Sequence, residues 1–208
     1  MGVKERKLRQ KEEVRCQILD AAWQIVKEEG WQSLSMRKIA DRIEYTSPII
    51  YGHFENKEAL LQEFTRKGFV KLCEMIRAAY QAHIDNAPAR LEAMWMAYWN
   101  FAFANRESYQ LMYGVEMGCC TIKNGIPESE ECAEMINSTI QEIIASGKHP
   151  DADPCLKYFT CWSVVHGLIS INITRNPEAL HQSDDDSPNL NELILKDAIA
   201  GIVSQMLN

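Results

Sequence analysis

Cysteine and histidine are the residues of this chain whose chemistry could support metal binding, nucleophilic catalysis or redox exchange. The seven cysteines form no Cys-x-x-Cys pair, and no histidine stands at zinc-ligand spacing from a group of them. The five histidines are scattered, and the sequence has no nucleophile elbow, phosphate-binding loop or paired carboxylate site. The sequence therefore predicts no enzyme activity, no cofactor and no metal.

The odd number of cysteines favours free thiols in a chain that we expect in the cytoplasm. No apolar run approaches the roughly 20 residues that cross a bilayer, and the basic start has no apolar segment behind it. We therefore expect no membrane contact. The adjacent Cys119 and Cys120 fall in a predicted loop and are either inert thiols or a redox switch.

Cationic side chains gather toward the N-terminal end. The formal net charge of the chain is -7, but residues 1–70 carry a net +2 and the remainder a net -9. A mildly basic end on an acidic body suits contact with DNA, although a solvated charged face would give the same pattern. Basic residues between Lys4 and Lys11 could form an arm against DNA or be disordered away from it.

The elements that position these side chains are helices. Apolar residues recur with helical periodicity almost everywhere, and strand-like alternation is nearly absent. Gly30 is a natural end for the first helix, and Ser35, Thr46 or Ser47, and Asn56 are candidate caps for the next three. The pattern predicts an all-α fold of about nine helices. We expect an N-terminal domain over residues 1–65 and a helical body over 66–208.

Residues 35–61 contain two very short helices separated by a tight turn. Helices this short are marginal in water, so they must pack on a neighbour. Apolar residues such as Ile39 and Ile50 supply that packing, with the first helix as a lid. Three helices in this order describe a helix-turn-helix unit, whose last helix would enter the major groove of DNA.

The stretch from about Arg9 to Glu63 resembles the DNA-binding domain of the tetracycline-repressor (TetR/AcrR) family. The resemblance is carried by Ile18-Leu19-Asp20-Ala21-Ala22, Gly30, Met36-Arg37-Lys38-Ile39-Ala40 and the continuous block from Ile50 to Leu61. One position departs from the pattern, because the family usually has glycine in the turn where this chain has Glu44. The turn is therefore either strained or different in geometry.

The resemblance implies which residues contact DNA. The start of the third helix would face base edges, because hydroxyl and apolar side chains suit groove-edge acceptors and thymine methyl groups. Arg37 would reach a phosphate or a guanine edge. Residues after the third helix starts would hold phosphates, Tyr51 among them, whereas Phe54 is expected in the core. The implied DNA-binding residues are Arg37, Thr46, Ser47, Pro48, Ile49, Tyr51, His53 and Lys57.

In this family the body forms a homodimer and often holds a small-molecule effector. Small residues recur at helical spacing in the last two helices, which would let helices of two subunits approach closely or would serve packing inside one chain. The expected dimer interface comprises Ser163, Gly167, Ser170, Ile194, Ala198, Gly201 and Ile202. The run from Trp162 to Gly167 also resembles a Trp…His-Gly (WHG) C-terminal subfamily.

Five aromatic residues between Trp95 and Phe103 cannot all lie on one helix face, so some must line a cavity or an interface. The expected effector pocket comprises Trp95, Tyr98, Trp99, Phe103, Tyr113, Met117, Trp162 and His166. The leading hypothesis is a repressor that binds a palindromic DNA operator as a dimer and is released by a small apolar or aromatic effector. The alternative is an effector-independent DNA-organising protein, or a regulator controlled by a protein partner.

Overall fold

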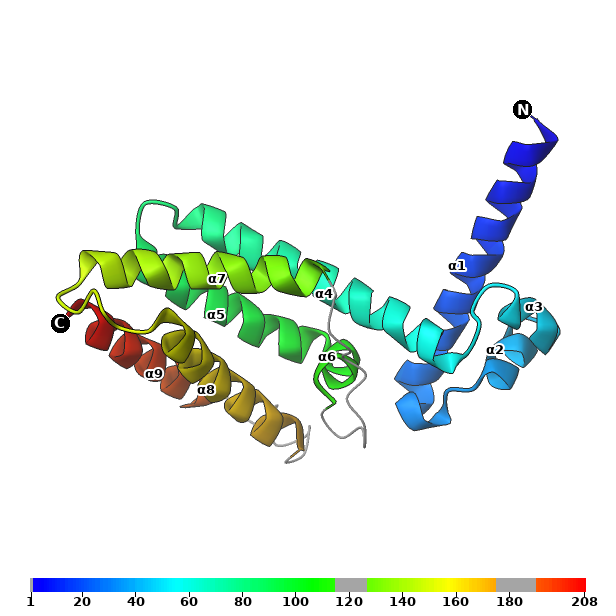
Figure 1. The fold of residues 1–208 in the computed structure, drawn as a ribbon. Coiled ribbons are helices and arrows are strands. Elements are labelled where there is room, and N and C mark those ends of the chain that lie inside the picture. Colours follow the sequence, from blue (N-terminus) through cyan, green and yellow to red (C-terminus); the bar gives the residue numbers. More distant parts are fainter. Residues whose placement is uncertain (1, 115–126, 175–189) are drawn as a thin grey trace. The chain divides into compact units, whose positions relative to one another are not determined.

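The computed structural model describes residues 2–114, 127–174 and 190–208. Within these ranges it contains nine α-helices and one short 3-10 helix, and no strand (Figure 1). The expected all-α fold is confirmed. Met117, Cys119 and Cys120, for which the sequence suggested roles, lie outside the described residues.

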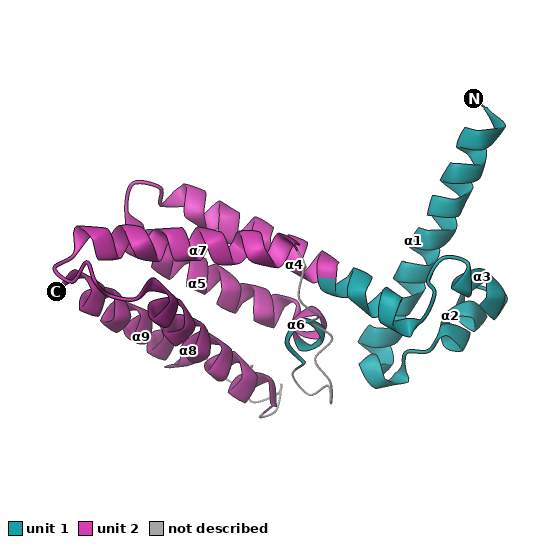
Figure 2. Ribbon diagram, viewed as in Figure 1, with its two compact units in different colours: residues 1–65, 110–122 teal, residues 66–109, 123–208 magenta. Residues whose placement is uncertain are grey.

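The helices group into two compact units (Figure 2). The first comprises residues 1–65 with 110–122, and the second residues 66–109 with 123–208. The second half of helix α6 (Arg106–Tyr113) groups with the N-terminal unit, and the expected domains over residues 1–65 and 66–208 stay a prediction. Helix α4 (Lys57–Ala82) runs without a break from one unit into the other.

Aromatic residues hold the first unit together. It consists of α1 (Val3–Glu29), the 3-10 helix η1 (Trp31–Ser33), α2 (Met36–Arg42), α3 (Ser47–Tyr51) and the start of α4. The rings of Trp23, Trp31 and Phe64 meet with centroids 5.6 to 6.0 Å apart, which is the usual spacing of attractive aromatic pairs. This cluster joins α1, η1 and α4.

Helix α1 begins at Val3, well before the apolar stripe that predicted it. The basic residues from Lys4 to Lys11 therefore lie on a helix, and all of them are exposed. The helix ends at Gly30, whose φ of 81° is a conformation that suits glycine.

The second unit is built around α7 (Pro127–Ser146). Helices α5 (Ala87–Ala104), α8 (Pro154–Thr174) and α9 (Leu190–Leu207) all pack on α7, and α8 also packs on α9. Asn86 caps α5 by accepting a hydrogen bond from the Ala89 N–H at 3.1 Å. Within the described ranges, no helix combines the length and the apolar character that crossing a membrane requires.

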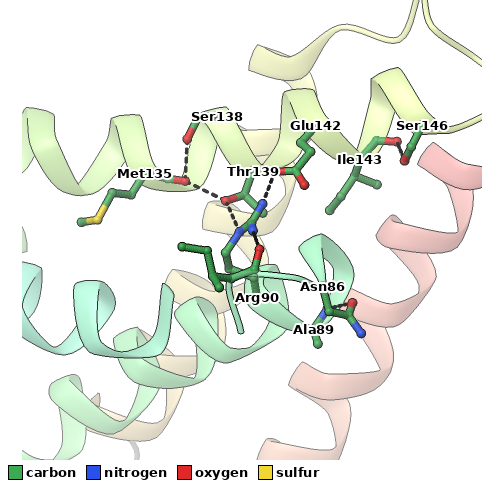
Figure 3. A network of polar contacts seen from close by, with 10 residues as sticks. Asn86, Ala89, Arg90, Met135, Ser138, Thr139, Glu142, Ile143 and Ser146 are labelled. Carbon is green, nitrogen blue, oxygen red and sulfur yellow. Dashed lines mark hydrogen bonds and ion pairs between the residues drawn. The ribbon is translucent and has the colours of Figure 1, made fainter. Parts of the chain in front are cut away.

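A buried arginine closes the turn between α4 and α5 (Figure 3). The Arg90 side chain is only 2% exposed, and it donates to the Thr139 hydroxyl, the Ile84 carbonyl and the Glu142 carboxylate. Its guanidinium also lies over the Tyr80 ring, with Cζ 4.9 Å from the centroid. Burying a charge is tolerable only with partners of this kind, so the network fastens α5 to α7.

Gly147 ends α7 where the chain end of α9 passes close by. A Cβ at this position would lie 2.0 Å from the carbonyl oxygen of Met206, closer than any side chain can come. The next residue, Lys148, donates its N–H to the Leu207 carbonyl at 3.2 Å. Glycine is required here for the approach of two backbones.

Candidate nucleic-acid interface

The two short helices of the N-terminal unit are held by a few fully buried side chains. Helix α2 has 7 residues and α3 has 5, so neither could persist alone. Ile39 and Ile50 are 0% exposed and belong to the core that α1 covers. The Ser35 hydroxyl caps α2 by accepting from the Lys38 N–H at 3.2 Å.

The turn between α2 and α3 contains a left-handed residue. Glu44 has a φ of 58°, and it is the only non-glycine with a positive φ in the described part of the chain. The turn therefore keeps the left-handed geometry that usually requires glycine and is strained, rather than different in geometry, because a residue with a Cβ disfavours this conformation. The Tyr45 N–H, which donates to the Ala40 carbonyl at 3.0 Å, helps to fix the turn.

Helix α3 turns one face inward and exposes the other. Ile50 is the buried anchor, whereas Ile49 and Tyr51 are 39% and 53% exposed. Thr46 and Pro48 are exposed as well, Ser47 partly so, and the Thr46 side chain makes no capping hydrogen bond. The exposed face therefore carries the predicted mixture of hydroxyl and apolar groups.

Salt bridges distinguish the cations of α2. Lys38 contacts Glu29 at 2.6 Å and Arg42 contacts Glu28 at 2.5 Å, so both hold α2 to α1. Arg37 is 87% exposed and has only a loose contact of 3.8 Å with Asp41 of its own helix. Arg37 is therefore the cation of α2 that points away from α1 and is available to an anion.

The start of α4 lies beside α3 in sequence and offers a further anion contact. The Asn56 side chain caps α4 by accepting from the Ala59 N–H at 2.7 Å. Lys57, the first residue of the helix, is partly buried. The helix dipole disfavours a cation at this positive end of the helix, so the dipole does not explain Lys57. Contact with an anion at the helix N-terminus is a role that suits it.

Two aromatic residues, Tyr51 at the end of α3 and Phe54 just after it, differ in burial. Phe54 is 4% exposed and packs under the guanidinium of Arg15, 4.6 Å from its ring centroid, whereas Tyr51 is exposed. His53 is half-buried, and its Nδ1 finds no hydrogen-bond partner among the described residues. Burial lowers the pKa of His53, and the nearby Lys11 and Arg15 lower it further. The lowered pKa favours the neutral imidazole of His53, which can still donate a hydrogen bond to a phosphate.

The predicted pocket residues form two aromatic groups in the second unit. Trp95 and Tyr98 contact each other, with ring centroids 5.8 Å apart, and Trp162 stacks on His166 at 4.7 Å. Tyr109 bridges these pairs, because it contacts both Tyr98 and His166. Trp99 and Phe103 form a separate pair at 4.6 Å. Tyr113 belongs to the first compact unit.

Sequence reasoning did not assign Tyr109 to the pocket. Tyr109 is fully buried, and its hydroxyl lies 2.5 Å from Nδ1 of His166. Its position on a separate short helix hid its relation to His166, which lies on α8. A cavity of about 270 Å³ opens elsewhere, between α7 and α8, and none of the predicted pocket residues lines it. Its walls are formed by Ala133, Glu134, Asn137, Cys155, Tyr158 and Phe159.

Helices α8 and α9 present an apolar face to solvent. Of the predicted interface residues, Ser163, Ile194 and Gly201 are exposed, and Gly167, Ser170 and Ala198 are partly exposed. Ile202 is only 7% exposed and therefore belongs mainly to the core of its own chain. The sequence reasoning missed the large apolar residues that continue this face, each 45% to 61% exposed: Leu156, Phe159, Ile171 and Leu193.

Two family models match the chain. Residues 18–64 match a model described as bacterial regulatory proteins, tetR family. Residues 91–190 match a model described as tetracyclin repressor-like, C-terminal domain. Together the two matches take in the helix-turn-helix and most of the second unit. The subfamily suggested by Trp162 to Gly167 stays a prediction.

Curated relatives match parts of the chain. It is 29% identical over 103 residues to the HTH-type transcriptional activator FasR of Mycolicibacterium smegmatis, which covers 50% of this chain and 47% of that protein. It is 27% identical over 153 residues to the class A tetracycline repressor protein from transposon 1721 of Escherichia coli, covering 71% and 64%. The alignments thus span about half to two thirds of these relatives.

A solved structure extends the likeness to the whole fold. A protein of unknown function from Rhodococcus sp. RHA1 superposes with a TM-score of 0.71 at 22% identity, over 93% of this chain and 95% of that chain. At this identity the likeness concerns the fold alone. The helix order of both units therefore recurs in another protein.

Proposed function

Because the chain belongs to the tetR family of bacterial regulatory proteins, which are DNA-binding transcription regulators, we propose that it is a repressor released from its operator by a small molecule. The operator would be palindromic and bound by a homodimer. The released form would be favoured by an apolar or aromatic effector. The curated relatives include an activator and a repressor, so repression rather than activation is part of the proposal.

The exposed face of α3 is the observation that carries the DNA-binding part of the proposal. Ile49 and Tyr51 are exposed on a helix of five residues that is anchored by Ile50 alone. Apolar and hydroxyl groups displayed on a rigid support suit direct contact with base edges in the major groove. Arg37 and Lys57 flank this face and suit phosphates.

Selection of bound duplexes from a random library tests this part. We expect an inverted repeat whose half-site centres lie about one helical turn, or roughly 34 Å, apart or a multiple of it. Footprinting on the selected duplex should then show two protected half-sites. Retrieval of duplexes without any symmetry, at moderate ionic strength, would contradict binding as a symmetric dimer.

The apolar face of α8 and α9 supports the homodimer. This face exposes three large apolar side chains to water: Leu156, Ile171 and Leu193. Exposed apolar patches of this kind mark interaction sites in proteins. A Cβ on Gly167 or Gly201 would meet nothing within 4 Å, so the glycines leave room beside the helix backbone rather than packing inside the chain. Two copies of this face could form a four-helix bundle.

Sedimentation equilibrium of a charge variant tests the dimer. Ile194→Asp places a carboxylate in the face, and we expect it to yield a monomer because a buried unpaired charge is costly. The matched control is Gln141→Asp on the exposed side of α7, which should remain dimeric. A dimeric Ile194→Asp protein, or a monomeric unmodified chain, would remove this interface from the proposal.

Half-buried aromatic groups support an effector site in the second unit. Trp162 and His166 are partly exposed and stack on each other, and His166 also contacts Tyr109, which is fully buried. Aromatic and apolar walls with a few fixed polar groups are the usual lining of small-molecule sites. A thermal-shift screen with apolar aromatic compounds, followed by operator titrations, tests this part. A compound that binds tightly but leaves operator affinity unchanged would exclude release by that compound.

The effector-independent alternative is favoured by the close packing of the same residues. Trp95 is 0% and Tyr98 3% exposed; their rings contact each other, and the Tyr98 ring also contacts Tyr109. Such a cluster can be a core without a ligand. Genome-wide footprinting separates the two, because a repressor should occupy few sites and a DNA-organising protein many.

A further inference from the structure

The cavity between α7 and α8 lies apart from the residues expected to hold an effector. Its volume is about 270 Å³, and a cavity of roughly 150 Å³ is enough to hold a benzene ring. There is therefore room for a single ring that carries a short side chain. Three residues of α7 and three of α8, all in the second unit, line it: Ala133, Glu134, Asn137, Cys155, Tyr158 and Phe159.

The α7 side of the cavity is acidic. Helix α7 has five glutamates and no lysine or arginine. Three of the glutamates form ion pairs with arginines of α4 and α5, namely Glu128, Glu131 and Glu142. Glu134, which lines the cavity, is exposed and forms no ion pair with a described residue. The one lysine of α8, Lys157, donates instead to the Gln205 side chain of α9 at 3.1 Å. The carboxylate beside the cavity is thus uncompensated within the described ranges.

The α8 side of the cavity is aromatic. The rings of Tyr158 and Phe159 meet edge to face, with centroids 5.3 Å apart and planes at 88°. Burial raises the pKa of Tyr158, so its phenol keeps its proton and stays neutral. The face of a neutral ring attracts a cation that lies within about 6 Å of its centroid. Aromatic rings opposite a carboxylate therefore suit an organic cation better than an anion.

An unsatisfied polar atom borders the same space. Oδ1 of Asn137 is shielded from water and has no hydrogen-bond partner among the described residues. A buried acceptor without a donor is destabilising, so a donor that reaches it is favoured. Because Asn137 lines the cavity, a turn of its amide would present this oxygen to a donor inside. An ammonium group carries only donors and fits this requirement.

We propose that this cavity is a further small-molecule site, which binds an organic ammonium ion with one aromatic ring, such as an arylalkylamine. The ammonium group is held by Glu134 and Asn137, and the ring of the ligand packs on Tyr158 and Phe159. Tyr158 also contacts Trp95, with ring centroids 6.0 Å apart, so an occupied cavity adjoins the residues expected to hold the effector. Binding at this site does not depend on DNA binding.

The expected dimer interface lies on another face of α8. At about 100° per residue, Ser163 and Gly167 lie about 80° and 120° around the helix from Cys155. Phe159, about 40° from Cys155, lies between the two faces. Cys155 is exposed, so a ligand can enter from the side on which this thiol lies while the dimer is intact.

Protection of Cys155 from alkylation tests the proposal on the full chain. Cys155 and Cys16 are both exposed free thiols, but Cys16 lies in the first unit and serves as the internal control. The chain is treated with N-ethylmaleimide at increasing concentrations of phenethylammonium, and alkylation of each thiol is followed by mass spectrometry. We expect saturable protection of Cys155 and an unchanged rate at Cys16. The neutral 2-phenylethanol should protect only at roughly tenfold higher concentration, and the anionic 3-phenylpropionate should not protect.

A charge substitution locates the ammonium group. Glu134→Gln keeps the shape of the side chain but removes its charge, so it should weaken phenethylammonium about threefold or more and leave 2-phenylethanol unchanged. The matched control is Glu130→Gln, one turn earlier on α7 and outside the cavity, which should bind like the unmodified chain. Should Glu134→Gln fail to fold, isothermal titration of the unmodified chain with the three compounds still ranks them by charge.

Three results would overturn the proposal. The first is an absence of protection at Cys155, or equal protection by the ammonium, the alcohol and the carboxylate. The second is unchanged affinity for phenethylammonium in a folded Glu134→Gln chain. The third is a Cys155 that reacts only in the Ile194→Asp monomer, which would show that the partner subunit covers the cavity. None of these readouts uses DNA, so this site and the proposed operator binding fail separately.

Discussion

The hydroxyl oxygen of Tyr109 lies 2.5 Å from Nδ1 of His166. Burial raises the pKa of Tyr109, so the hydroxyl keeps its proton and donates it to the histidine. Burial also lowers the pKa of His166, so the ring is neutral and accepts at Nδ1. The two shifts agree on one arrangement, with the histidine proton on Nε2.

The imidazole of His166 should therefore titrate below its usual pKa of about 6.5 in an NMR titration. Tyr109→Phe removes a donor to the neutral ring, so the pKa of His166 should rise toward the usual value. Tyr158→Phe, which leaves the hydrogen bond in place, is the control and should change the titration little. An unchanged pKa in Tyr109→Phe would show that burial alone holds the ring neutral.

Stability should depend on pH through the same group. The unfolded chain binds a proton at His166 at a higher pH than the folded chain does. The contribution of His166 to the free energy of unfolding is therefore complete above about pH 6.5. The free energy of unfolding should then fall as the pH drops from there toward the lower folded pKa. Urea titrations at several pH values measure this slope, and His166→Gln should make it shallower. A slope that is identical in the variant would assign the effect to His53 or to the carboxylates.

Replacement of Arg90 should destabilise the second unit. Arg90→Ala removes three hydrogen-bonded contacts and the stacking on Tyr80, and we expect a loss of about 3 kcal/mol in the free energy of unfolding. Glu142→Gln should cost less than about 1 kcal/mol, since that carboxylate is 58% exposed. Chemical denaturation measures both, and equal losses would mean that the ion pair rather than the buried network carries the stability.

Gly147→Ala should be among the most damaging small substitutions in the chain. The added methyl group would meet the Met206 carbonyl oxygen at 2.0 Å, so the backbone of α7 or α9 must move. We expect a loss of about 2 kcal/mol or more. The neighbouring Ser146→Ala should remain within about 0.5 kcal/mol of the unmodified chain. A tolerated Gly147→Ala would mean that the end of α9 detaches readily.

Glu44→Gly should stabilise the helix-turn-helix. Glycine relieves the left-handed strain at φ 58°, and this gain exceeds the added flexibility of the unfolded chain, leaving a net increase of about 1 kcal/mol. Glu44→Ala removes the same carboxylate but keeps the Cβ, so it should give no gain. Thermal unfolding of both variants separates backbone strain from charge.

Two substitutions in the candidate interface should affect DNA binding differently. Lys57→Ala should weaken binding to all duplexes alike and reduce the salt dependence by about one phosphate contact. Ile49→Ala should relax the preference at one base step, by about 1–3 kcal/mol, with little change in salt dependence. Fluorescence anisotropy on operator and random duplexes measures both. Parallel effects of the two variants on both duplexes would remove the assignment of base contacts to α3.

Local interactions are what the sequence predicted well. The caps at Ser35 and Asn56 join residues three apart, so their types alone reveal them, and both hydrogen bonds are present. Helical periodicity located the long helices for the same reason. The helix-turn-helix was predictable because one continuous block of residues contains it.

Relations between distant residues could not be predicted. A single arginine at the start of a helix is typical of an exposed residue, and the partners that bury Arg90 lie on α7 and before α5. The requirement for glycine at position 147 comes from the backbone of α9, which lies far from it in sequence. Such contacts are set by packing, which no local pattern encodes.

The continuity of α4 restricts how this protein could be recombined with its relatives. Leu60 and Phe64 are buried in the first unit, and Leu72 and Ile76 in the second, all on one unbroken helix. One inserted residue would rotate every later side chain by about 100° and advance it by about 1.5 Å. A junction placed between Phe64 and Leu72 therefore leaves the internal spacing of each buried set intact, whereas an insertion inside either set would turn its later members away from the core that they fill.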